Sequence, residues 1–134
     1  TGFQPWARMA NRLFPLPDTY SPAAIGFLEK NLPPGNLFNE YAWGDYLIYA
    51  MEPSPKVFID GRADMYGEEI FGDYVKIARL DQETDDLLDR YEIDWIVFPS
   101  SKPLPRYLKA QRTWTEIFSD DQVSILIRKA GFSQ

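Results

Sequence analysis

Short, wholly apolar runs between polar boundaries are the feature that most constrains the fold of this chain. Residues 57–59 read Val-Phe-Ile, and residues 94–98 contain the run Trp-Ile-Val-Phe. A strand with one exposed face would alternate polar and apolar side chains, so both runs predict strands that are buried on both faces. A further short strand is expected at 36–39. Because helical patterns separate these strands, the sequence predicts right-handed β-α-β crossovers and a parallel sheet.

The helical patterns have identifiable starts and ends. Ser21 followed by Pro22 is a helix start, because Ser caps the N-terminus and Pro is tolerated at the first helical position. Helices are expected from Pro22 to the breaker at 31–35, and over 43–51, 66–80, 84–91 and 103–112. Strands at 114–118 and 122–128 are expected to form a hairpin. The predicted fold is therefore α/β: three α/β/α layers, with a mostly parallel central sheet of about five strands and a C-terminal antiparallel hairpin.

Composition excludes several classes of site. The chain has neither histidine nor cysteine, which removes Ser-His-Asp and Cys-His nucleophiles, zinc held by His or Cys, and disulfides. A net charge of −6 argues against nucleic acid as a partner, because nucleic-acid binding needs a basic face. Aromatic residues make up 16% of the chain, and this surplus suits a surface that binds a sugar or a protein partner as well as a core.

The sequence divides into a lead-in over 1–18 and a single α/β domain over 19–130. Within the lead-in, apolar residues recur at helical spacing with arginines on another face, before Pro15 and Pro17. Such a segment is typical of a juxtamembrane element, and the alternative is an N-terminal strap over the domain. The chain contains no run of about 18 apolar residues. It begins at Thr1 without a signal-peptide pattern, so we expect it to be a piece of a longer protein.

Polar residues follow each of the first three predicted strands. If those strands are parallel, their carboxyl ends share one edge of the sheet, where open α/β sheets bind ligands. The candidate ligand-binding residues at this edge are Asn39, Glu40, Trp43, Asp60, Arg62, Asp64, Ser100 and Ser101, with Lys102 beside them.

Three functions are open to this edge. Asp60 and Asp64 are candidate oxygen ligands of a divalent cation, with Arg62 meeting a phosphate; apart from this cation, no cofactor is expected. A carboxylate pair also suits the acid–base chemistry of glycoside hydrolysis. The third function is binding without turnover, with Arg62 and Trp43 as anchors. A purely structural role, in which Arg62 pairs with the aspartates and pins the loop, is the alternative to all three. The non-catalytic readings are favoured.

Two motifs carry a resemblance to a known family: Phe-Asn-x-Tyr-x-Trp-Gly at 38–44 and Phe-Ile-Asp-Gly-Arg at 58–62. Over residues 22–128 the sequence resembles the soluble C-terminal domain that follows the last membrane span in bacterial polytopic proteins of the mannosyltransferase-like, GT-C type. The resemblance implies a domain on the extracytoplasmic (periplasmic) face of the bacterial inner membrane, tethered by upstream spans. Its expected partners are its own transmembrane region and a carbohydrate or lipid-linked sugar.

The resemblance also implies which role the chain has. In such enzymes the catalytic carboxylate generally lies in a loop between early membrane spans, which this chain lacks. We therefore expect a non-catalytic, extracytoplasmic accessory domain, with a binding or structural role. The alternative is a sugar- or phosphate-handling enzyme domain that uses the Asp60, Arg62 and Asp64 loop, with a divalent cation.

Overall fold

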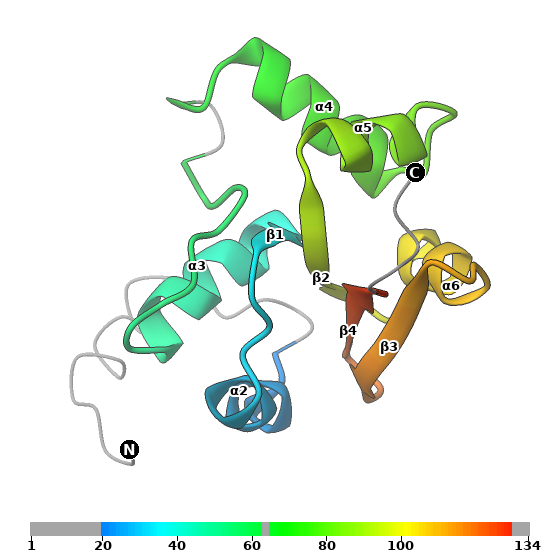
Figure 1. Cartoon of the computed structure of the whole chain (residues 1–134). Helices are drawn as coiled ribbons and strands as arrows, with labels where there is room; N and C mark the ends of the chain where they lie inside the picture. Colours follow the sequence, from blue (N-terminus) through cyan, green and yellow to red (C-terminus); the bar gives the residue numbers. More distant parts are fainter. Residues whose placement is uncertain (1–19, 63–64, 130–134) are drawn as a thin grey trace.

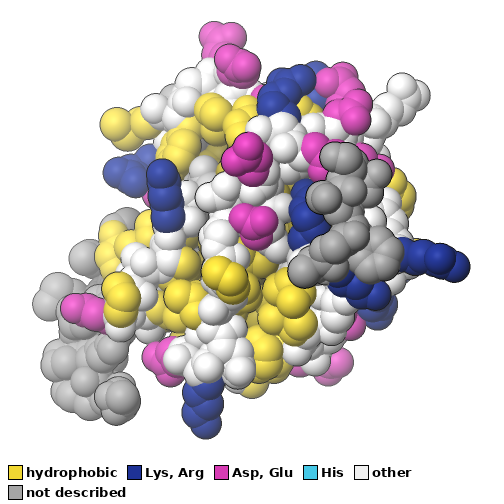
Figure 2. Space-filling view, viewed as in Figure 1, with side chains coloured by type: hydrophobic (Ala, Val, Ile, Leu, Met, Phe, Trp, Pro, Cys, Tyr) yellow, Lys and Arg dark blue, Asp and Glu magenta, His cyan; other side chains and the backbone are white. Residues whose placement is uncertain are grey.

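The computed structural model describes residues 20–62 and 65–129, and these form a mixed α/β domain (Figure 1; Figure 2 shows the side chains in the same view). The predicted lead-in at 1–18 and Asp64 lie outside the described residues. The elements in chain order are α2 (Pro22–Lys30), β1 (Asn36–Asn39), α3 (Tyr41–Ala50), α4 (Glu68–Ala78), α5 (Thr84–Arg90), β2 (Ile93–Pro99), α6 (Pro103–Lys109), β3 (Trp114–Ser119) and β4 (Val123–Arg128).

The sheet differs from the prediction in size and direction. The described residues form one sheet of four strands in the order β1-β2-β4-β3. Only β1 and β2 are parallel, while β4 is antiparallel to both β2 and β3. The expectation of a mostly parallel sheet of about five strands is therefore wrong, because β4 of the C-terminal hairpin pairs directly with β2. The hairpin itself is confirmed.

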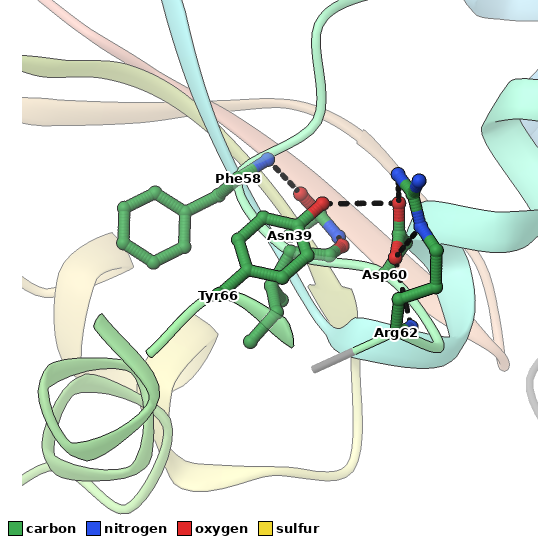
Figure 3. Close-up of polar contacts among 6 residues, drawn as sticks. Asn39, Phe58, Asp60, Arg62 and Tyr66 are labelled. Atoms are coloured by element: carbon green, nitrogen blue, oxygen red, sulfur yellow. Dashed lines mark hydrogen bonds and ion pairs between the residues drawn. The ribbon is translucent and has the colours of Figure 1, made fainter. Parts of the chain in front are cut away.

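The strand that is missing is the one predicted at 57–59. This segment forms no backbone ladder; the side chain of Asn39 takes its place. Asn39 Oδ1 accepts the N–H of Phe58 at 2.7 Å, and Asn39 Nδ2 donates to the carbonyl of Ile59 at 2.7 Å (Figure 3). The prediction of a strand is wrong, although Ile59 is fully buried. An apolar run indicates burial but does not by itself indicate a strand. Here the side-chain amide of Asn39 forms the hydrogen bonds that a neighbouring strand would have formed.

Helices pack against both faces of the sheet. Along β2, Trp95 and Val97 belong to an apolar cluster with residues of α2 and α3, whereas Ile96 and Phe98 belong to a second cluster with residues of α4, α5 and α6. Figure 1 shows α2 and α3 below and to the left of β2, with α4 and α5 above it and α6 to its right. Burial on both faces explains why residues 95–98 of β2 are apolar without alternation.

The helix starts follow from local capping. Ser21 Oγ accepts the N–H of Ala24 at 3.1 Å, and Pro22 is the first residue of α2, as the sequence predicts. Helix α3 begins two residues before its predicted start, because the side chain of Glu40 accepts the N–H of Trp43 and caps the first turn. None of the helices in the described ranges has the length and apolar character needed to cross a membrane.

Candidate functional site

The loop at 57–62 is clamped between the end of β1 and the first turns of α3. Gly44 of α3 faces this loop so closely that a Cβ at position 44 would lie 2.0 Å from the carbonyl oxygen of Ile59. Only glycine permits that approach of helix and loop backbone. Gly44 therefore allows one face of α3 to pack directly against the start of the Asp-Gly-Arg turn.

Asp60 is the buried centre of the loop, and its side chain receives four hydrogen bonds. Oδ1 accepts the backbone N–H of Arg62 at 2.9 Å and its Nε at 3.1 Å. Oδ2 accepts Nη2 of Arg62 at 2.8 Å and the hydroxyl of Tyr66 at 3.0 Å (Figure 3). The Arg62 side-chain bonds outweigh the effect of burial and hold the pKa of Asp60 below its ordinary value.

The ion pair between Arg62 and Asp60 has one member inside the protein and one outside. The Asp60 side chain is 1% exposed and that of Arg62 is 68% exposed. Because Arg62 and Tyr66 occupy both carboxylate oxygens, the charge of Asp60 is neutralised where it lies. In the described residues, no group of three or more Asp or Glu side chains is placed to hold a metal ion.

A second carboxylate, Asp45, lies on the other side of the turn. Its carboxylate accepts a hydrogen bond from the backbone N–H of Gly61, and a Cβ at Gly61 would lie 2.3 Å from Oδ2 of Asp45. Partial burial raises the pKa of Asp45 above its ordinary value; the Gly61 N–H and the positive charge of Arg62 oppose this rise, and the negative charge of Asp60 adds to it. Within 20–62 and 65–129, no Lys or Arg forms an ion pair with Asp45.

Asp45 and Asp60 both line one cavity of about 400 Å³. Its lining residues are Asp45, Ile48, Tyr49, Asp60, Gly61 and Arg62. The cavity combines a neutralised ion pair, an aspartate that forms no ion pair with the described residues, and the apolar surface of Ile48. Such a mixture is suited to binding a small polar or charged group.

The predicted site residues divide into those beside this cavity and those away from it. Asp60 and Arg62 line the cavity, and Asn39 holds the backbone that precedes Asp60. Glu40 caps α3, and Trp43 is fully buried, with its ring edge-on to Tyr46 at a centroid distance of 4.8 Å.

Ser100 and Ser101 follow β2 and belong to different surroundings. The hydroxyl of Ser100 donates to the carbonyl of Asp120 at 2.9 Å and lies 2.9 Å from the hydroxyl of Ser124, so it fastens β2 to the hairpin. Ser101 is exposed. The three predicted strand ends therefore do not form one site. The segment at 57–59 is a loop held by Asn39, and Ser100 is bonded to the hairpin.

Asp45, Ile48 and Tyr49 line the cavity but were not among the predicted site residues, and Asp45 is the charged one of the three. It falls inside a helical pattern, where a single acidic residue is more often a solvated one. Gly44 beside it is a weak signal, because an isolated glycine within a helix can mark a close approach of another part of the chain, as at Gly44, or open space, as at Gly26.

Comparison with known proteins shows a likeness in fold. No family model matches the sequence, and no curated protein matches it. Among solved structures, the chain is similar to the C-terminal globular domain of an oligosaccharyltransferase from Archaeoglobus fulgidus, with a TM-score of 0.57 and 10% sequence identity. The match covers 80% of this chain and 95% of that domain. The similarity therefore extends over nearly the whole of the archaeal domain, and at this identity it shows a shared fold.

Proposed function

We propose that this chain is a non-catalytic accessory domain at the C-terminal end of a membrane-embedded glycosyltransferase of the GT-C type. The observation that carries the proposal is the fold, which matches 95% of a domain described as the C-terminal globular domain of an oligosaccharyltransferase. The motifs at 38–44 and 58–62, which resemble the C-terminal domains of mannosyltransferase-like proteins, support the same assignment independently of the fold.

The occupancy of Asp60 supports a non-catalytic role. A catalytic or metal-binding carboxylate needs an oxygen that can reach the substrate or the ion, and both oxygens of Asp60 already accept hydrogen bonds from Arg62 or Tyr66. The alternative, a sugar- or phosphate-handling enzyme using Asp60, Arg62 and Asp64, would require the hydrogen bonds of Asp60 to Arg62 or Tyr66 to break. We therefore assign the Asp-Gly-Arg turn a structural role.

The proposed setting is the periplasmic face of a bacterial inner membrane. Upstream spans would tether the domain there, and residues 1–18 would form the juxtamembrane connection. In this position the domain would contact its own transmembrane region and a carbohydrate or lipid-linked sugar.

The test is fractionation of the native, full-length gene product, followed by protease treatment of intact spheroplasts. We expect the product in the inner-membrane fraction, with this domain cleaved from the outer side. A cytoplasmic marker protein that stays intact controls for lysis. A soluble product, or a domain that is cleaved only after lysis, would overturn the proposal.

A further inference from the structure

We propose that the cavity beside Asp45 binds an organic cation, an ammonium or guanidinium group on a short apolar stem. The charges around the cavity carry the proposal. Asp60 and Arg62 cancel one another through two side-chain hydrogen bonds at 2.8 and 3.1 Å. Asp45 has the Gly61 N–H as hydrogen-bond donor and, in the described part of the chain, forms no ion pair; the nearby charge of Arg62 acts on Asp45, but the Arg62 side chain is bonded to Asp60. The two aspartates and the one arginine that line the cavity thus leave it with one net negative charge.

The position of Asp45 is built into the fold. Gly44 brings α3 onto the loop, and the missing side chain of Gly61 leaves the space in which the Asp45 carboxylate sits 2.3 Å from where a Cβ would be. Two glycines thus hold a carboxylate in a partly desolvated place, where its charge is costly without a counter-ion. A cation that enters the cavity would remove that cost.

The size and lining of the cavity select the kind of cation. A volume of about 400 Å³ is far larger than a bare metal ion needs, and calcium or magnesium would require several further oxygen ligands. Ile48 and Tyr49 line the same cavity and offer surface for methylene groups or for a cation beside an aromatic ring. An alkylammonium or alkylguanidinium group matches this combination, either as a lysine or arginine side chain of a partner protein or as a free amine.

The direct test is a titration of the 134-residue chain with n-butylammonium and with n-butylguanidinium, followed by the backbone amide shifts in NMR spectra. We expect saturable, weak binding with a Kd of about 1–10 mM, and shifts centred on Asp45, Ile48 and Gly61. The stronger of the two probes indicates whether ammonium or guanidinium is the natural group. No saturable binding of either probe, or shifts centred elsewhere, would overturn the proposal.

Two variants with the same change in net charge distinguish binding at this site from non-specific attraction of the cation to an acidic protein. Asp45→Asn keeps an acceptor for the Gly61 N–H, and we expect it to weaken binding at least about tenfold. Asp121→Asn, at an exposed position in the β3–β4 turn, should leave the Kd within about twofold of the parent value. Equal weakening in both variants would contradict the proposal. So would saturable binding of glucose at the same amides with equal affinity. The outcome does not depend on membrane attachment, so the proposed function and this site can fail separately.

Discussion

At one edge of the sheet β3 pairs with β4 through a backbone ladder, whereas at the other edge the chain beyond β1 is held by the side chain of Asn39. A ladder distributes its hydrogen bonds over many residues and uses groups that nearly every residue has. On the other side, the two hydrogen bonds to the backbone of residues 58 and 59 both come from the buried side-chain amide of Asn39. The loop that carries Asp60 therefore depends on residue identity, and the hairpin depends mainly on backbone geometry.

The substitution Asn39→Ala tests how strongly the loop depends on this one side chain, and we expect it to have the largest effect. The substitution removes the partner of the part-buried N–H of Phe58 and of the buried carbonyl of Ile59, so the free energy of unfolding should fall by about 2–4 kcal/mol. Asn36→Ala at the exposed start of the same strand is the matched control. Its side chain donates a single bond to the carbonyl of Glu92, and its loss should cost less than about 1 kcal/mol. Urea denaturation measures both, and similar losses would contradict the concentrated role of Asn39.

The second substitution, Gly44→Ala, tests the close packing of α3 on the same loop. The added methyl group would lie 2.0 Å from the backbone oxygen of Ile59, which cannot rotate away, so we expect a loss of about 1–3 kcal/mol. Gly26→Ala in α2 is the control, because nothing lies within 4 Å of its Cβ position. There the better helix propensity of alanine should raise stability by up to about 1 kcal/mol. A loss at position 26 as large as that at position 44 would show that helix geometry, rather than the loop contact, is responsible.

Much of the fold could be predicted from local signals, because those signals act over a few residues. Ser21 followed by Pro22 favours a helix start through local capping alone, and the apolar run at 95–98 in β2 required cover on both faces. The order of the strands could not be predicted in this way. The pairing of β4 with β2 is a long-range choice, and no local pattern distinguishes it from a hairpin added at the edge.

The candidate site was predictable only in part, for a related reason. Asp60 and Arg62 are close in sequence, so their proximity was expected. The role of Asn39 required knowledge that residues 58 and 59 lie beside it, and the role of Asp45 required knowledge that α3 packs on Gly61. Side chains that contact residues 16 to 20 positions further along the chain, as Asn39 contacts Ile59, produce no periodic pattern in the sequence.

The third prediction concerns the buried carboxylate itself. Asp60→Asn weakens the bonds from Arg62 and Tyr66, and we expect it to lower stability by about 1–2 kcal/mol at pH 7. Because Arg62 holds the folded-state pKa of Asp60 below the ordinary 3.8, this contribution is complete above that pH and is lost as the pH falls through the lowered value. Thermal melts from pH 7 to pH 2.5 should therefore show the parent and the variant converging in acid. A difference that stays constant over this range would contradict an ionised, hydrogen-bonded Asp60.

The smallest expected effect belongs to Asp45, and its sign is opposite. Burial raises the folded-state pKa of Asp45 above 3.8, so ionisation disfavours the folded state, and the parent loses a little stability as the pH rises from 3.8 through the raised value. Asp45→Asn removes this loss and keeps an acceptor for Gly61, so the variant should melt slightly above the parent at pH 7 and together with it near pH 3. Two aspartates on either side of Gly61 would then respond to pH in opposite directions. Asp60 would stabilise the loop through its charge, whereas the charge of Asp45, which forms no ion pair with the described residues, would disfavour the folded state. A variant that melts below the parent at pH 7 would mean that the Asp45 charge already has a partner in the folded chain.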